Sequence, residues 1–501
     1  MRDDWKRTIH RGLIAGAMIL ATAGVAASAQ APVVRYVPGK TVLPLGEFDL
    51  ASIGYRSDEY FFSGNAQSYE PAGPLSSDGR WTVKPGAKAP FTTRIVVVRP
   101  TDPAKFNGTV LVEWLNVTAG RDMPADWILA HREMTRKGYA YVGVSVQKMG
   151  VDGSAQNQMS GATAMPLTKV DPQRYGTLVH PGDAFSFDIF TQAGAALKSP
   201  GAGGLLGPLS PRRVMALGES QSATFLTTYI NAIDPVARLY DGFFIHSRFG
   251  SGVALDSTRS FTGPNAIPRQ MIFRSDLRVP VLALITETDL IGGLLPGYYG
   301  SRRPDDARLR VWEVPGAAHV DNYFLGGTAI DAGPGGSANL APFFLPKAEP
   351  AGSPTEKSIN PGMAHHYVYQ AALAAFDRWV RTGKPPASAP LMEMAPGSTA
   401  EQPVLAVDPL GLTRGGVRSP WVDVPTMRIT GVGNKGSFLA TLGGIGERFD
   451  KATLAKLYPG GKADYLRRFT RALDKAIASG HILTADRQEI IEIAAINFDK
   501  S

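Results

Sequence analysis

The chain has 501 residues, a formal net charge of +8 and no cysteine. The missing cysteines exclude disulfide bonds, thiolate metal ligands and a lipid anchor attached through cysteine. Hydrophobic residues make up 44% and charged residues 19%, as in an ordinary globular protein, and the length suits one large domain or two smaller ones. Basic residues are scattered and do not alternate with aromatic ones, which argues against a nucleic-acid-binding protein.

The first 29 residues are predicted to be a secretory signal peptide. A basic start with Lys6 and Arg11 precedes the apolar run 12–27, and Ala27-Ser28-Ala29 has the pattern of a cleavage site. The run is short and rich in alanine, which disfavours the alternative of an uncleaved membrane anchor. We therefore expect export by the general secretory route to the periplasm or medium, with a mature chain that starts at Gln30 and keeps no stable membrane anchor.

From residue 40 onward, strand-like runs come first and then alternate with helix-like segments. This alternation predicts an α/β protein with a mostly parallel central sheet, helices on both faces, and the carboxyl ends of the strands at one edge, where ligands bind. The expected strands are 59–62, 93–99, 108–114, 139–146, 214–217, 239–246, 279–285 and 309–314. The expected helices are 126–137, 182–197, 223–232, 363–382, 451–458, 464–479 and 485–495. Residues 326–361 predict a long loop that forms a lid or pocket wall.

Residues 213–222 predict a buried strand, a tight turn and a helix. Gly218-Glu-Ser-Gln-Ser222 in the turn has the pattern glycine, any residue, serine, any residue, small residue. A serine at this place is exposed at the carboxyl end of the sheet, as the nucleophile of a hydrolase is. The last position is normally glycine and here is Ser222, but the need there is only for a small side chain. Ser220 is the expected nucleophile, and the alternative is a structural turn serine.

A serine nucleophile needs a histidine base, and on this type of sheet the chain order is serine, acid, histidine. The chain has eight histidines. His319 follows the expected strand 309–314 through a turn of small residues, which is where the base belongs. The other seven lie in the predicted signal, before the serine, too soon after it, inside a helix or in the C-terminal tail: His10, His131, His180, His246, His365, His366 and His481.

The carboxylate that orients the histidine should follow the strand 279–285. That strand runs into Thr286-Glu-Thr-Asp289, so two acids are available. Asp289 lies a few residues past the strand end, the usual reach towards the histidine, and is favoured. Glu287 is the alternative acid.

The site also needs two backbone donors for the oxyanion of the reaction intermediate. The N–H of Gln221 is one, because it follows the serine directly. The second should come from the loop after the strand 108–114, at Asn116 or Val117. Neither a metal nor a cofactor is indicated, because the metal-binding motif His-Glu-x-x-His is absent.

The chain resembles a family of exported bacterial proteins described as "alpha/beta hydrolase domain". The resemblance covers most of the mature chain and rests on these segments: 106–109, 112–117, 174–176, 180–183, Gly218-Glu-Ser-Gln-Ser222, Thr286-Glu-Thr-Asp289, Gly316-Ala-Ala-His319, 420–425 and 457–459. It implies the α/β-hydrolase fold, with long loop insertions, and a serine-hydrolase site. It gives no substrate.

Together these features predict a carboxylic ester hydrolase that acts on a small-molecule ester through Ser220, Asp289 and His319. The alternatives are an amidase or peptidase, a lactonase or an acyltransferase with the same residues, and an inactive periplasmic binding protein. Residues 30–385 are expected to form the hydrolase domain, and residues 386–501 a helical C-terminal extension packed on it.

Overall fold

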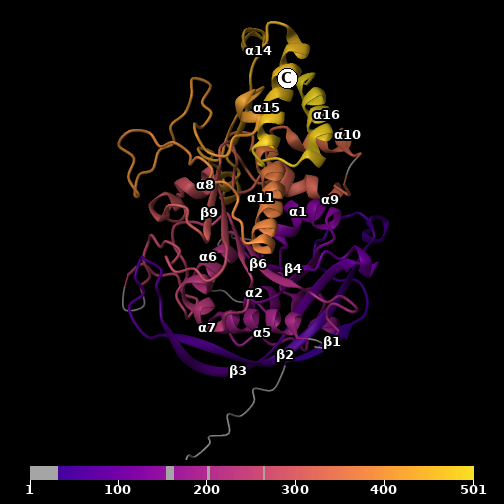
Figure 1. Ribbon diagram of the computed structural model, residues 1–501, viewed down its shortest axis with the longest axis vertical. Coiled ribbons are helices and arrows are strands. Elements are labelled where there is room, and N and C mark those ends of the chain that lie inside the picture. Colours follow the sequence, from indigo (N-terminus) through magenta and orange to yellow (C-terminus); the bar gives the residue numbers. More distant parts are fainter. Residues whose placement is uncertain (1–31, 154–162, 200–203, 263–265, 334, 501) are drawn as a thin grey trace, which may run out of the picture. The chain divides into compact units, whose positions relative to one another are not determined.

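In the computed structural model, a nine-stranded sheet organises the described residues, which are 32–153, 163–199, 204–262, 266–333 and 335–500. Its strands lie in the order β1-β2-β3-β5-β4-β6-β7-β8-β9 (Figure 1). The predicted signal peptide lies outside the described residues. The bounds are β1 Val33–Val37, β2 Tyr55–Pro71, β3 Val83–Pro100, β4 Thr109–Trp114, β5 Ala140–Val144, β6 Arg213–Glu219, β7 Phe243–His246, β8 Val281–Thr286 and β9 Leu309–Val314.

The six strands from β5 to β9 in this order are parallel, as predicted, and β1, β2 and β3 add an antiparallel edge. The expected strands 59–62 and 93–99 are only parts of β2 and β3, which have 17 and 18 residues. Pro85 and Pro90 hid the length of β3 in the sequence. Both lie where β3 pairs with β2 alone, a place that tolerates residues without an N–H.

Helices connect the strands at nearly the predicted places. The expected helix 363–382 is α11, with the same bounds, and the expected helix 223–232 is α6 followed by a π-helical turn, Tyr229–Ile233. The longer helices are α1 Ala125–Arg136, α5 Ser186–Lys198, α6 Gln221–Thr228, α11 Met363–Thr382, α14 Lys451–Leu457, α15 Gly461–Ala478 and α16 Arg487–Phe498. The shorter ones are α2 Lys148–Val151, α3 Leu167–Val170, α4 Pro172–Tyr175, α7 Asp234–Ala237, α8 Glu287–Ile291, α9 Thr328–Ile330, α10 Ser337–Leu340, α12 Pro420–Asp423 and α13 Phe438–Gly443.

Both faces of the sheet are buried, each in its own hydrophobic cluster. Along β6, Met215 and Leu217 join one cluster, whereas Val214 and Ala216 join the other. Neighbouring residues of a strand point to opposite faces, so this division separates the two sides of the sheet. The first cluster includes side chains of α1, α11, α15 and α16, and the second includes side chains of α5 and α6. The central strands are therefore mostly apolar, which made them recognisable in the sequence.

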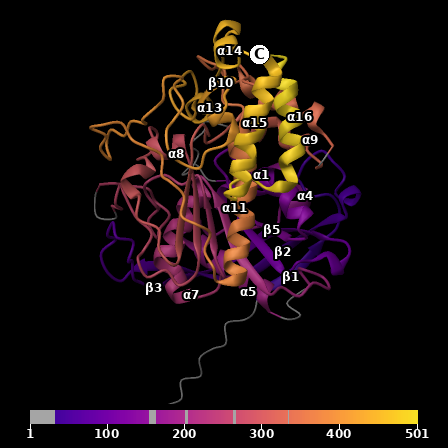
Figure 2. The same ribbon diagram turned by 45° about the horizontal axis from the view of Figure 1, so that its top comes forward.

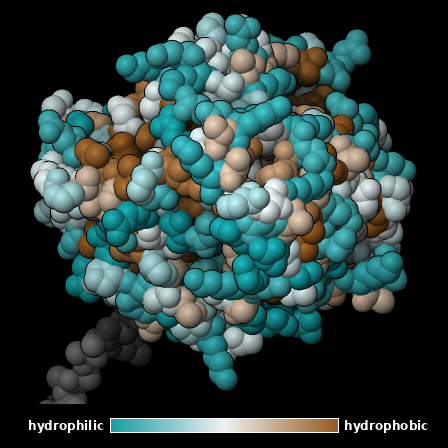
Figure 3. Space-filling model, turned by 90° about the horizontal axis from the view of Figure 1, so that it is seen from above, coloured by the Kyte–Doolittle hydropathy of each residue, from teal (hydrophilic) through white to brown (hydrophobic). Residues whose placement is uncertain are grey.

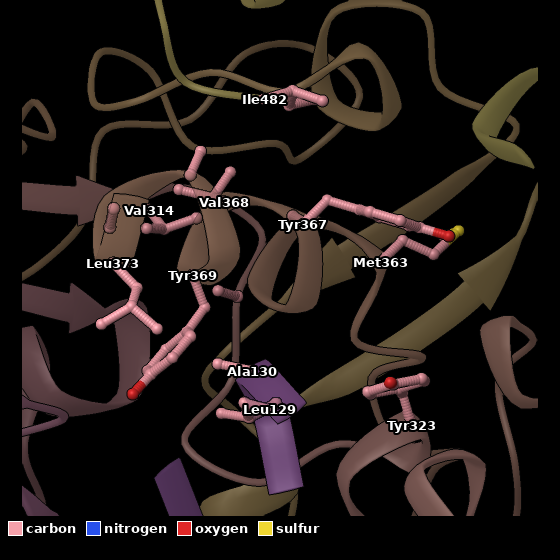
Figure 4. Packing of buried hydrophobic residues seen from close by; sticks show 14 of the residues in the cluster. Leu129, Ala130, Val314, Tyr323, Met363, Tyr367, Val368, Tyr369, Leu373 and Ile482 are labelled. Carbon is pink, nitrogen blue, oxygen red and sulfur yellow. The ribbon is translucent and has the colours of Figure 1, made fainter. Parts of the chain in front are cut away.

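Helix α11 is the central helix of the first cluster (Figure 4). Its Tyr367, Val368 and Leu373 are fully buried. They pack in a cluster that also holds Leu129 of α1 and Val314 of β9. The helix ends at Gly383, which adopts a left-handed φ of 72° and donates its N–H to the carbonyl of Trp379.

The C-terminal part of the chain contributes to the same cluster. Helices α15 and α16 lie side by side (Figure 2) and bury Phe469 and Ile490. Arg132 of α1 forms two hydrogen bonds to the carboxylate of Glu489 in α16, of 2.5 and 3.0 Å. A two-stranded sheet, β10 Met427–Thr430 with β11 Ile445–Arg448, precedes these helices. The domain boundary at residue 385 stays a prediction.

The outer surface is mixed in character. On the face that is uppermost in Figure 1, hydrophilic side chains dominate and hydrophobic ones show between them in smaller groups (Figure 3). Within the part of the chain that is described, no helix combines the length and the apolar character that crossing a membrane requires.

Leu373→Ala should lower the free energy of unfolding by about 2–5 kcal/mol, because it leaves a cavity in the α11 cluster. Arg378→Ala on the exposed side of the same helix is the matched control and should change stability by less than about 1 kcal/mol. Denaturant unfolding measures both. Equal losses in the two variants would contradict the position of α11 in the core.

Candidate active site

Ser220 lies in a strained turn between β6 and α6. Its φ is 56° and its ψ is −113°, a conformation that a residue with a side chain rarely adopts. The turn is held on both sides. The N–H of Ser220 donates to the carbonyl of His246 at 3.0 Å, and the carbonyl of Ser220 accepts from the N–H of Thr224 at 3.0 Å. This is the predicted elbow, with a half-buried serine at its tip.

The small residues of the motif are explained by the close approach of α6 to β6. A Cβ atom at Gly218 would lie 2.8 Å from Cδ1 of Leu226 and 3.1 Å from Cβ of Ser222. A side chain at position 218 would therefore crowd α6. A small residue such as serine suits position 222, because its Cβ and carbonyl carbon both lie close to Gly218.

His319 is within hydrogen-bond distance of both Ser220 and Asp289. Its Nε2 lies 2.8 Å from Oγ of Ser220, and its Nδ1 lies 2.5 Å from Oδ1 of Asp289. The backbone N–H of His319 donates to the hydroxyl of Thr288, and its ring lies 5.3 Å from that of Phe249. The three side chains predicted from the chain order thus come together, in an arrangement in which a histidine can take the proton of a serine.

The structure places the alternative acid, Glu287, away from the histidine. One oxygen of its carboxylate accepts the N–H of Gly316 at 2.6 Å. The other accepts the hydroxyl of Thr430 and the N–H of Gly431, both at 2.7 Å. Glu287 therefore fastens the turn that carries His319 to the C-terminal strand β10. Asp289 keeps one oxygen for the histidine, and its other oxygen accepts two hydrogen bonds from Thr286.

A second carboxylate, Glu219, touches the histidine from the other side. Its Oε1 lies 3.3 Å from Nε2 of His319, and its Oε2 accepts a hydrogen bond from Nδ2 of Asn116 at 2.9 Å. Burial raises the pKa of Glu219 to about 8. For His319, burial lowers the pKa, but the carboxylates of Asp289 and Glu219 outweigh burial and raise it above its usual value. A role of Glu219 could not be predicted from the sequence, because a residue at the variable position of the motif carries no signal of its own.

The expected oxyanion donor Asn116 requires a correction. Its backbone N–H donates to the carbonyl of Met123 at 3.0 Å, in an isolated β-bridge, and is not free for a substrate. The next N–H, that of Val117, has no acceptor among the described residues and is the remaining candidate of the two. The first expected donor, the N–H of Gln221, opens α6, where an N–H has no acceptor within the helix.

The side chain of Asn116 braces this loop against the serine turn. Its Oδ1 accepts the N–H of Thr118 at 2.8 Å, and its Nδ2 donates to the carbonyl of Glu219 at 3.1 Å as well as to the carboxylate. Val117 lies between the two loop residues so held. Asn116 thereby fixes the position of the Val117 N–H relative to Ser220.

Ser220 and His319 line a cavity of about 480 Å³ whose walls are largely apolar. The loop expected at 326–361 contributes Ala351 and Ser353, and the segment after α8 contributes Leu294 and Leu295. The C-terminal helix α13 adds a further wall, which the sequence did not indicate. The lining apolar side chains include Met123, Phe249, Leu294, Leu295, Phe324, Leu325, Phe438 and Leu442, and Arg121 and Arg259 also line the cavity.

Two of the excluded histidines form a buried pair beside the site. Nε2 of His246 lies 2.7 Å from Nε2 of His365, and Nδ1 of His365 lies 3.0 Å from Oδ2 of Asp321. Burial lowers the pKa of His246 well below its usual value. The pair therefore links β7 to α11. In the described residues, no group of three or more ligating side chains is arranged to hold a metal ion.

The chain belongs to the alpha/beta hydrolase domain family, whose model matches residues 21–492. The fold and the chain order of Ser220, Asp289 and His319 agree with that membership. Among curated proteins, none matches the sequence.

Solved structures of hydrolases share parts of the fold only distantly. A putative dienelactone hydrolase from Klebsiella pneumoniae subsp. pneumoniae MGH 78578 is 12% identical over 54% of this chain and 93% of its own, with a TM-score of 0.27. Esterase Est22 is 15% identical over 47% of this chain and 65% of its own, with a TM-score of 0.26. The rice cell wall degrading esterase LipA from Xanthomonas oryzae is 14% identical over 44% and 50%, with a TM-score of 0.25. At these values the matches support no conclusion about a substrate.

Asp289→Asn should lower kcat/KM for an ester by roughly 10³–10⁴-fold, because asparagine cannot stabilise the imidazolium of His319. Glu287→Gln should act on stability, with a loss of about 1–3 kcal/mol, because an amide cannot accept all three hydrogen bonds. Steady-state kinetics and thermal unfolding separate the two effects. A folded Glu287→Gln protein with the larger loss of kcat/KM would assign the acid to Glu287.

Asn116→Ala should lower kcat by roughly 10²-fold with little change of KM, because the Val117 N–H loses its fixed position. Kinetics on a small ester, with thermal unfolding as a check of the fold, measures this effect. An unchanged kcat would show that the loop holds its position without the Asn116 side chain.

Proposed function

We propose that this alpha/beta hydrolase is a serine esterase that cleaves small carboxylic esters through an acyl-enzyme. The observation that carries the proposal is the chain of short contacts from Ser220 Oγ through the ring of His319 to Asp289. These contacts give the serine a base and give the base an orienting carboxylate.

In the first half of the reaction, Ser220 Oγ attacks the ester carbonyl and its proton passes to Nε2 of His319. The oxyanion is bound by the N–H of Gln221 and that of Val117. His319 then gives the proton to the leaving alcohol, and the acyl group stays on Ser220. In the second half, His319 takes a proton from water, which attacks the acyl carbon, and then gives that proton to Oγ of Ser220 as the acid leaves. Asp289 stabilises the imidazolium in both halves.

The same residues would serve an amidase or peptidase, a lactonase or an acyltransferase. The cavity of about 480 Å³ supports a small-molecule substrate with a substantial apolar part. A panel of esters, amides and lactones with matched acyl groups distinguishes these activities.

We propose further that residues 1–29 direct export and are removed, so that the reaction takes place in the periplasm or the medium.

Ser220→Ala should reduce the hydrolysis of short p-nitrophenyl esters on the order of 10⁵-fold, because no other group can form the acyl-enzyme. The matched control is Ser222→Ala, two residues further on. Oγ of Ser222 is buried and has no hydrogen-bond partner among the described residues, so its loss should leave the rate within a few fold. Retained activity in folded Ser220→Ala protein would refute the proposal.

A further inference from the structure

Nε2 of His319 has two polar neighbours. Oγ of Ser220 lies at 2.8 Å and Oε1 of Glu219 at 3.3 Å. A ring nitrogen carries at most one proton, and it must be unprotonated to take the proton of a serine. Nε2 can therefore bond to Ser220 or to Glu219, and the choice depends on whether Glu219 and His319 are protonated.

The carboxylate of Glu219 is held in this place. The residue is 4% exposed, and its Oε2 accepts from Nδ2 of Asn116 at 2.9 Å, which leaves Oε1 beside the histidine. Burial raises the pKa of Glu219 to about 8. The charge of each group shifts the pKa of the other, so Glu219 and His319 titrate as a pair.

We propose that Glu219 shares a proton with Nε2 of His319 and thereby sets the pH at which the histidine becomes a base for Ser220. In the one-proton form, the imidazolium donates its Nε2–H to the ionised carboxylate. Loss of that proton to solvent frees the lone pair of Nε2 for the hydroxyl of Ser220. Glu219 acts through His319 and is a positioning residue. The inference rests on the proposed function, because the reaction of Ser220 reports it.

Other ionisable groups face this pair from the surrounding elements, and a substitution of Glu219 leaves them in place. The negative charges of Asp126 in α1 and Asp289 in α8 raise the pKa of Glu219, and Glu219 in turn raises that of Tyr369 in α11. Facing His319 is the buried histidine His246 of β7, whose pKa the charge of His319 lowers. Two arginines, Arg121 and Arg259, line the cavity that the pair adjoins.

The sign of the effect follows from charge. An ionised Glu219 stabilises the protonated histidine and raises its pKa. On the acid side of the pH profile, the reaction rate of Ser220 rises as His319 loses its proton, and this rise is called the acid limb. Removing the carboxylate should therefore move the acid limb to lower pH by about one unit. Glu219→Gln and the apolar Glu219→Met both remove it. Glu219→Asp retains a carboxylate and should keep the limb near its original place.

The test is the rate at which a fluorophosphonate labels Ser220 across about pH 5 to 9. In this reaction the Oγ–P bond forms, the P–F bond breaks, fluoride leaves, and the serine proton passes to His319 and then to solvent. Each substitution is made in the full-length protein. Glu356→Gln, which removes an exposed carboxylate, is the control and should show the same labelling rate of Ser220 as the wild type at each pH.

The expected result is an acid limb at lower pH in Glu219→Gln and Glu219→Met, and an unmoved limb in Glu219→Asp. A merely structural role would lower the rate at every pH without moving the limb. If the limbs of wild type and of whichever neutral variant folds coincide, the proton sharing is wrong and the hydrolase assignment stands. If the wild-type serine is not labelled at any pH, the proposed function itself fails.

Discussion

The parallel pairing of β6, β7, β8 and β9 is the constraint on which the site depends. Because these strands are parallel, their carboxyl ends lie at the same edge of the sheet. The turns that follow β6, β8 and β9 therefore meet at that edge. Ser220 and His319 are 99 residues apart in the chain and 2.8 Å apart in space for this reason. The strain at Ser220 is maintained because β6 is buried on both faces and its turn is bonded to β7 and α6.

The C-terminal residues complete the site rather than merely cover the fold. Glu287 connects the turn before His319 to β10, and the N–H of Val320 donates to the carbonyl of Leu442 in α13 at 3.1 Å. A Cβ atom at Gly431 would lie 2.5 Å from the carbonyl oxygen of Ala317. The histidine turn is therefore packed between the sheet and the C-terminal segment, and α13 also walls the cavity.

The sequence predicted the parallel core well because its strands are mostly apolar. It predicted Ser220 and His319 because chain order and strand ends restrict the choice. It favoured Asp289 over Glu287 only because of the distance of each acid from the end of its strand. Glu287 instead bonds to Thr430 of β10, which lies 143 residues further along the chain and could not be linked to it from the sequence. The use of the Asn116 N–H in a bridge to Met123 could not be foreseen, since a backbone bond between two loop residues leaves no mark in their side chains. Glu219 was missed for a related reason: its meaning comes from its burial beside the histidine, which only the folded chain creates.

If Ser220 carries an acyl group during turnover, peptide mapping by mass spectrometry after rapid acid quench will detect it. With a p-nitrophenyl ester as substrate, the expected result is the mass of the acyl group on the peptide that contains Ser220, and its absence in Ser220→Ala protein. An adduct on another residue, or continued turnover of the ester by Ser220→Ala protein, would contradict it.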